Sequence, residues 1–216
     1  MEQLKYPVGR FIFPEIADKN NWIEWKETIR IFPDLLENLS KNLTDNQLNM
    51  QYRPDGWTAR QVIHHVADSH SHAMIRFKWA LTEDKPTIKP YLEGKYALLP
   101  DYSLPIESAI WILKGVHHKW IHIMDQMSES DRLKGYYHPE TGRFFSLYDA
   151  AALYSWHCRH HLAHITSATQ APSKHDKVLQ PVLKRRGRPQ STLKTLTKSP
   201  KAKSSLTRAE ILDKAR

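Results

Sequence analysis

The sequence predicts an all-α fold built around a bundle of four long helices. Four stretches of the 216-residue chain carry apolar side chains at the three- and four-residue spacing of an amphipathic helix. They run from about residue 20 to 41, from 58 to 81, from 105 through 124 and from 146 to 168. Capping residues or a first-turn proline begin them, and few stretches show the alternation that is typical of strands.

The first half of the chain supplies an arm and two of these helices. Residues 1–18 contain two prolines and a glycine and are expected to form an extended arm. The first helix carries an apolar stripe that begins at Trp22 and Trp25, and Pro33 bends or divides it. Two capping boxes follow, which predict a short helical turn and then the start of the second long helix: Thr44 with Gln47, and Thr58 with Gln61.

A long connection without helical periodicity separates the second helix from the third. Residues 82–103 contain three prolines and a glycine, and connections of this length are often functional. The third helix begins near Pro105, because proline is favoured in a first turn. Residues 136–142 are expected to form a turn, and Ser146 with Asp149 caps the fourth helix. Because the second connection is long, the bundle need not have a simple up-down-up-down topology.

Charge divides the chain into a body and a basic tail. Residues 171–216 hold 13 of the 32 Lys and Arg and 3 of the 23 Asp and Glu, a net charge of +10 that leaves −1 for residues 1–170. The tail contains no aromatic residue and is rich in Ser, Thr, Lys and Pro, so we expect it to be disordered. We therefore assign residues 1–170 to one helical domain and 171–216 to a low-complexity tail.

Nothing in the sequence predicts membrane insertion or export. No run of about 18 apolar residues occurs, and the first residues lack the basic and then apolar pattern of a signal peptide. The single cysteine, Cys158, has no partner for an internal disulfide. We expect a cytoplasmic protein without membrane contact.

Histidine is concentrated in two windows, on the second and fourth predicted helices. Eight of the 13 histidines lie in residues 64–72 and 157–164. Imidazole is the commonest metal ligand in proteins, and three protein ligands with an open fourth position form a catalytic zinc site. At about 100° per residue, the four histidines of the later window share one core-facing stripe. The alternative is a set of interior histidines satisfied by hydrogen bonds alone, but each buried imidazole then needs polar partners.

Helical geometry does not decide which histidines would be ligands. Two pairs in the later window have the same i,i+4 spacing: His157 with His161, and His160 with His164. In the earlier window His70 lies well inside the apolar stripe, whereas His65 lies on its flank. Geometry alone therefore nominates His70 as the most buried histidine of that helix.

Five motifs, in order along residues 4–170, resemble the YfiT-type branch of the DinB superfamily, whose members are described as metal-dependent hydrolases. They are YPVG (6–9), GWTARQVIHHVADSH (56–70), RFK (76–78), HPETG (138–142) and WHCRHHLAHI (156–165). The resemblance implies a four-helix bundle with a zinc or nickel site, and a homodimer. Matched motif to motif, it implies that one divalent metal per chain, zinc before nickel, is bound by His65, His160 and His164.

Other polar side chains in the two windows are candidates for supporting roles. Asp68 could orient a ligand imidazole, or it could be a solvated helix charge. His161, like His157 and His64, could act as a base or proton shuttle, with ordinary hydrogen bonding as the alternative. Cys158 lies far from the histidine stripe, and we do not expect it to be a nucleophile.

The favoured function is metal-dependent hydrolysis of a small molecule. A metal held by three histidines lowers the pKa of its bound water to about 7 and polarises a carbonyl oxygen. The competing interpretation, which the superfamily resemblance supplies, is transfer of a low-molecular-weight thiol of the bacillithiol type to an electrophile. No substrate signature in the sequence separates the two.

The tail carries a separate motif. Its segment KRRGRP (184–189) resembles an AT-hook, in which Arg186, Gly187, Arg188 and Pro189 would lie in an A·T minor groove. The alternative is a generic basic tail that contacts phosphate. DNA contact of this kind would be an accessory property beside the enzyme activity.

Overall fold

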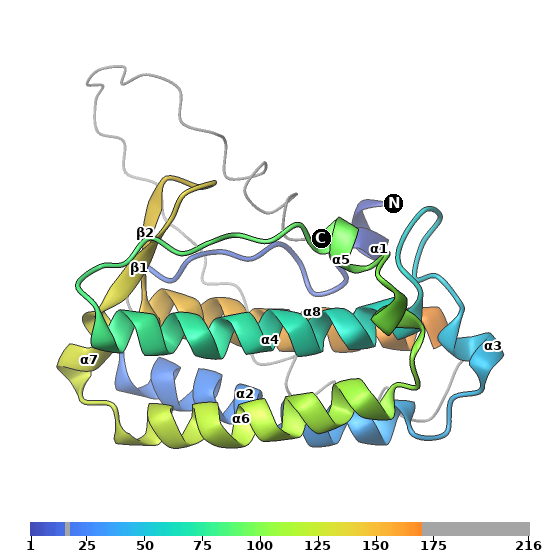
Figure 1. The fold of residues 1–216 in the computed structure, drawn as a ribbon, viewed down its shortest axis with the longest axis horizontal. Coiled ribbons are helices and arrows are strands. Elements are labelled where there is room, and N and C mark those ends of the chain that lie inside the picture. The colour runs from blue at the N-terminus through green and yellow to red at the C-terminus, as the bar shows by residue number, and fades with distance from the viewer. Residues whose placement is uncertain (16–17, 170–216) are drawn as a thin grey trace, which may run out of the picture.

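The computed structural model describes residues 1–15 and 18–169, and four long helices dominate it. They are α2 (Lys19–Ser40), α4 (Ala59–Thr82), α6 (Glu107–Gln126) and α8 (Leu147–Thr169). Helices α4 and α8 form one layer, and α2 and α6 form a second layer against it (Figure 1). The predicted all-α bundle is confirmed. The basic tail and its AT-hook-like residues Arg186, Gly187, Arg188 and Pro189 lie outside the described residues.

The four helices are not connected in the order in which they pack. Helix α2 packs against α6 and α8, and α4 packs against the same two helices. Consecutive long helices α2 and α4 therefore lie diagonally across the bundle, as do α6 and α8, and only the connection from α4 to α6 joins neighbours. The topology thus differs from a simple up-down-up-down bundle, as was considered possible from the sequence, but the departure lies in the first and third connections and not in the long second one.

The helix starts follow the capping chemistry of the sequence. Both predicted capping boxes are present, one at α4 and one at the short helix α3 (Asp45–Leu48). The carboxylate of Asp18 accepts the backbone N–H of Asn21 at 2.8 Å and begins α2. Pro33 lies inside α2 without dividing it.

The connections contain more structure than the sequence predicts. The expected loop of residues 82–103 contains the helical turns α5 (Glu93–Tyr96) and η1 (Pro100–Ser103), and further short helices are α1 (Glu2–Lys5) and α7 (Glu129–Leu133). The expected turn is the tip of a hairpin formed by β1 (Gly135–His138) and β2 (Arg143–Ser146). Four-residue strands are too short for a visible alternation, which explains why they were not predicted.

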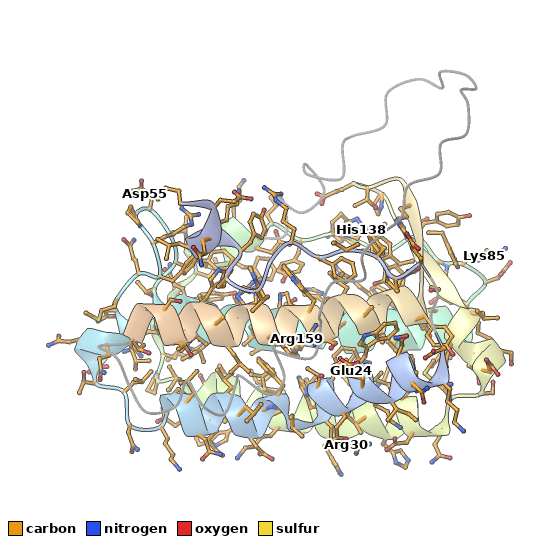
Figure 2. The ribbon with its side chains drawn as sticks, turned by 180° about the vertical axis from the view of Figure 1, so that it is seen from behind. Glu24, Arg30, Asp55, Lys85, His138 and Arg159 are labelled. Atoms are coloured by element: carbon orange, nitrogen blue, oxygen red, sulfur yellow. The ribbon has the colours of Figure 1, made fainter. Side chains whose placement is uncertain are left out.

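Two extended segments cover the outer face of the α4–α8 layer. The N-terminal arm and the segment that follows α4 both run along this layer, on the side opposite α2 and α6 (Figure 1). The indole N–H of Trp156 donates to the Gly9 carbonyl at 3.0 Å, and Ile88 donates its backbone N–H to Tyr137 in β1. Figure 2 shows the same arrangement from behind, with His138 outside α8 and Arg30 on the far side of the bundle. Because both faces of the α4–α8 layer are covered, polar side chains between these helices are buried.

No helix in the described part of the chain is long and apolar enough to cross a membrane.

Candidate metal centre

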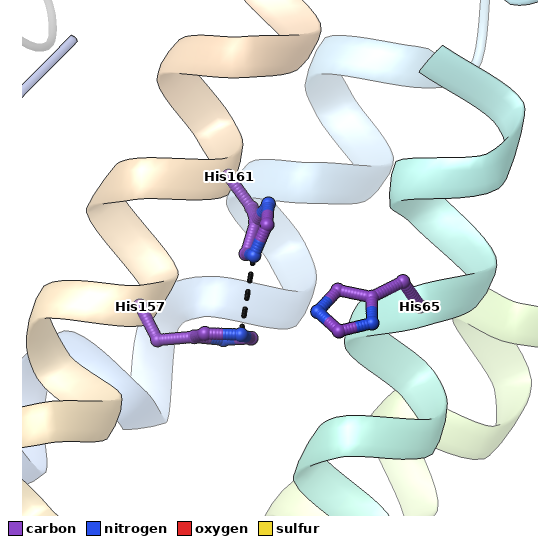
Figure 3. A group of neighbouring side chains, drawn as sticks. All are labelled: His65, His157 and His161. Atoms are coloured by element: carbon purple, nitrogen blue, oxygen red, sulfur yellow. Dashed lines mark hydrogen bonds between the residues drawn. The ribbon is translucent and has the colours of Figure 1, made fainter. Parts of the chain in front are cut away.

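Three buried imidazoles meet between α4 and α8. His65 projects from α4, and His157 and His161 project from successive turns of α8 (Figure 3). Each offers one ring nitrogen, and these nitrogens lie within 4.8 Å of one another. The three side chains are only 2%, 7% and 2% exposed.

A relay of hydrogen bonds fixes the His157 ring from the inner side of the bundle. The Nδ1 atom of His117 lies 2.7 Å from the Ile29 carbonyl oxygen, which can only accept, so His117 donates through Nδ1. A neutral His117 then accepts on Nε2 from Nδ1–H of His70, 2.7 Å away. His70 in turn accepts on Nε2 from Nδ1–H of His157, at 3.0 Å. This direction of donation leaves His157 with a free lone pair on Nε2.

A second, shorter relay fixes the His161 ring from the outer side. The Nε2 atom of His164 lies 3.2 Å from the Lys5 carbonyl oxygen, so His164 donates through Nε2. Its Nδ1 lies 3.4 Å from Nδ1 of His161 and accepts the proton of that ring. His161 is thereby left with a free lone pair on Nε2. The N-terminal arm, through Lys5, therefore contributes to the orientation of this imidazole.

The two relays meet at the contact between His157 and His161, where neither ring has a proton to donate. The Nε2 atoms of His157 and His161 lie 3.1 Å apart, and with both outer ends donating to carbonyls, these two atoms present lone pairs to each other. Five neutral imidazoles supply five ring protons to six contacts, so one contact must lack its proton. A cation at this contact removes the repulsion between the two lone pairs.

His65 stands beside this contact with no hydrogen bond of its own. Both of its ring nitrogens are buried and unpartnered within the described residues. Its ring centroid lies 5.4 Å from that of His157 and 4.9 Å from that of His161. A buried polar group without a partner costs about 1–3 kcal/mol, and nitrogen ligation to a metal would satisfy it.

Burial keeps these imidazoles neutral, which is the state that binds metal. Desolvation, together with the nearby His164, lowers the pKa of His65 to about 3. Desolvation also lowers the pKa of His117 to about 4, although its hydrogen bond to Ile29 opposes the shift. The pKa values of His157 and His161 are lowered in the same direction by burial and by the neighbouring histidines.

The donor set fits a divalent metal of the zinc type. Zinc binds histidine nitrogen at about 2.0–2.1 Å in tetrahedral geometry, which places two ligand nitrogens about 3.3 Å apart. The 3.1 Å between the two Nε2 atoms is close to that spacing. His157 and His161 are neutral, and each has its outer ring nitrogen in a hydrogen bond. His65 is also neutral, and neither of its ring nitrogens has a competing partner in the described residues. Three such imidazoles make a chemically suitable metal site.

The structure places the predicted ligand residues in two groups. His65 comes together with His157 and His161, which form one of the two i,i+4 pairs between which helical geometry did not decide. It does not come together with the other pair, His160 and His164. The latter two form a second group with His161, entirely on α8. In that group the Nε2 atom of His164 already donates to a carbonyl, and it contains no ligand from α4. We therefore regard the group that includes His65 as the candidate centre.

His160 has a different environment from its neighbours. Its ring stacks on Trp156 at a centroid distance of 4.3 Å and lies 6.1 Å from Tyr6 of the N-terminal arm. Its Nδ1 atom is buried without a partner among the described residues. Which of the two i,i+4 pairs meets His65 depends on how α8 is rotated and shifted against α4. The spacing of residues along one helix does not reveal this.

The remaining candidates have clear positions. Asp68 accepts a hydrogen bond from the Tyr102 hydroxyl at 2.7 Å, so its side chain is paired with a tyrosine and not with a ligand imidazole. The Nε2 atom of His64 lies 3.2 Å from the Leu104 carbonyl. Burial raises the pKa of the Cys158 thiol, consistent with the expectation that it is not a nucleophile. His70 is completely buried, as geometry predicted, and lies behind the centre as the second member of the inner relay.

Comparison with known proteins agrees with this fold. The family model of the DinB superfamily matches residues 28–165. The chain belongs to the DinB superfamily. The expected resemblance is therefore confirmed at the level of the family.

Relatives from Bacillus carry names that refer to a metal. A protein of Bacillus cereus (strain 03BB102) and one of Bacillus thuringiensis subsp. konkukian are each 44% identical to this chain over 167 residues, which is 77% of this chain and 96% of theirs. Both are named "Putative metal-dependent hydrolase". The solved structure of YfiT from Bacillus subtilis is 36% identical, with a TM-score of 0.75 over 77% of this chain and 95% of that one. It is described as a probable metal-dependent hydrolase with an unusual four-helix bundle topology.

Proposed function

We propose that the protein is a metal-dependent hydrolase of a small molecule and that its one divalent metal per chain is bound by His65, His157 and His161. One observation carries the proposal. The Nε2 atoms of His157 and His161 lie 3.1 Å apart with their lone pairs facing each other, beside the buried imidazole of His65, which has no partner in the described residues. The names of the relatives support the same reaction class. We take zinc as the first candidate metal and nickel as the second.

When bound, such a metal supplies Lewis acidity and a water of lowered pKa. The chain itself orients the ligands. His70 and His117 hold the proton of His157 on Nδ1, and His164 holds that of His161 on Nδ1, so both rings direct Nε2 toward the same point. Trp57, whose ring centroid lies 4.7 Å from that of His65, shields the third ligand. These contacts pre-organise the site and limit its exposure to water.

The test of the proposed function is an activity survey of the metal-loaded protein. A panel of small esters and amides is compared with a low-molecular-weight thiol plus an electrophile, using the full chain loaded with zinc or nickel. We expect metal-dependent hydrolysis that His65→Ala abolishes and that His118→Ala, a variant on α6 outside the centre, retains. Thiol transfer without hydrolysis would replace the proposed reaction, and equal rates in the His65→Ala protein would reject the site.

A further inference from the structure

A stripe of α4 continues from the candidate metal centre along the seam with α8. His65, Ser69, His72 and Arg76 are spaced at intervals of four, three and four residues, so they share one face of the helix. On α8, the corresponding face carries His161, His157 and Tyr154. The Tyr154 hydroxyl donates to the Ser69 carbonyl at 3.2 Å, which confirms that the two faces meet.

Arg76, at the far end of this stripe, is a buried charge without a partner. Its side chain is only 8% exposed. Within residues 1–15 and 18–169, no hydrogen bond, ion pair or cation–π contact involves its guanidinium. A guanidinium stays protonated and offers five N–H donors, so this arrangement leaves these donors without a protein partner within the described residues.

The surroundings of Arg76 are aromatic and almost uncharged. Tyr154, Tyr136 and Tyr91 are the principal groups that interact with its charge, followed by Glu93 of α5. Desolvation raises the pKa of Glu93 to about 7, so at neutral pH this carboxyl is charged in only part of the molecules. Tyr154 also contacts the metal centre, with its ring centroid 5.6 Å from that of His157. One tyrosine therefore separates the buried cation from a proposed ligand.

A second buried polar atom without a partner in the described residues lies near the same charge. Burial, followed by the charge of Arg76, lowers the pKa of His138 on β1 to about 4, so its ring is neutral. Its Nδ1 atom is buried without a partner in the described part of the chain. Figure 2 shows His138 in the layer outside α8, where the hairpin covers the seam.

An uncompensated buried charge is costly to the fold. Burying a charge without a partner costs several kcal/mol, and such groups normally pair or coordinate. An oxyanion would satisfy the guanidinium through two parallel N–H···O bonds, which is the geometry that arginine prefers. Tyrosine rings around it would provide apolar walls with hydroxyl groups for orientation.

We propose that Arg76 binds a carboxylate or phosphate group of the substrate, whose reacting group lies at the histidine centre. The role as a substrate subsite rests on the proposed function, whereas the anion site itself does not. Arg76 follows His65 by eleven positions on the same helix, an axial distance of about 16 Å. Side chains of both residues lean toward the helix N-terminus, and the longer arginine reaches further in that direction than the histidine, so the guanidinium lies somewhat less than this axial distance from the centre. The substrate class is therefore an elongated acid, with on the order of 10 Å between its anion and its reacting bond.

The anion site is tested first in the metal-free full-length protein. Inorganic phosphate and malonate are titrated at constant ionic strength, and binding is followed by calorimetry and by the shift in melting temperature. We expect saturable binding of one of the two anions to the wild type and to Lys78→Gln, which removes a neighbouring positive charge on the same helix. Arg76→Gln should weaken that binding about tenfold or more, because charge-assisted hydrogen bonds are lost. The anion that binds identifies the group as phosphate or carboxylate.

Stability distinguishes a binding role from a structural one. Removal of an uncompensated charge should leave the melting temperature of Arg76→Gln unchanged or raised, and a folded Arg76→Lys protein should bind the anion more weakly because it lacks the planar fork. Absence of binding to the wild type, or equal binding to Arg76→Gln, would overturn the anion site. If Arg76→Gln does not fold, the comparison of anion binding is made between the wild type and Arg76→Lys, and equal binding would again overturn the anion site. Because no metal is present, these outcomes are independent of the proposed hydrolysis.

The link to the metal centre is tested separately in the loaded protein. We expect Arg76→Gln to raise KM for an ester that carries a distant carboxylate and to leave KM for the corresponding neutral ester unchanged. Equal effects on both esters would overturn the assignment of the anion site to the substrate.

Discussion

Replacement of His70 by leucine tests the inner relay that orients the proposed ligand His157. Leucine fills a similar volume, but it cannot accept from Nδ1–H of His157 or donate to Nε2 of His117. The His157 proton is then no longer held on Nδ1, and tautomers that block Nε2 become populated. Loss of an outer partner of a ligand histidine typically costs about 10–100-fold in metal affinity.

The expected loss corresponds to about 1.4–2.8 kcal/mol of binding free energy. Zinc affinity is measured by competition with a chromophoric chelator, and circular dichroism establishes that the variant is folded. His118→Leu is the matched control, because His118 follows the relay residue His117 on α6 but its side chain is exposed and lies outside the centre. A folded His70→Leu protein with wild-type zinc affinity would refute the relay.

Three further predictions concern stability and reactivity. Because burial lowers the pKa of His117 to about 4, its contribution to the stability of the metal-free protein is full above pH 6.5 and is lost as the pH falls toward 4. In urea unfolding, His117→Phe should reduce the pH slope of stability in this window by about 1.4 kcal/mol per pH unit, and an unchanged slope would reject the neutral assignment. The Cys158 thiol, whose pKa burial raises, should react with a thiol reagent only at the rate of unfolding, and rapid labelling would contradict its burial. Gly135→Ala should lower the stability by about 1–3 kcal/mol, because a Cβ atom would clash with the Phe145 carbonyl oxygen; an unchanged melting temperature would argue against this hairpin register.

The parts of the fold that depend on local chemistry could be predicted from the sequence. The capping boxes at Thr44 and Thr58 each use side chains three residues apart, and both are present. The hairpin could not be predicted in the same way, because its strands are short and Gly135 is required by the close approach of Phe145 across the ladder. The requirement for this glycine comes from a contact between strands and not from the local sequence.

The candidate site could be predicted only in part for a similar reason. The face of α8 that carries the histidines follows from helical periodicity, but the choice between its two i,i+4 pairs depends on the register of α8 against α4. His117 could not be identified as part of the site from the sequence, because its partner His70 lies 47 positions away. Relays between helices leave no spacing pattern in a single sequence.

Metal analysis of paired variants tests the proposed centre most directly. The purified full-length protein, His157→Ala and His160→Ala are loaded with zinc, dialysed and analysed for metal per chain. We expect about one zinc in the wild type and in His160→Ala, and its loss in His157→Ala, because a catalytic site of this type has three protein ligands. Full zinc occupancy in His157→Ala, or loss of zinc in His160→Ala, would contradict the assignment of His65, His157 and His161.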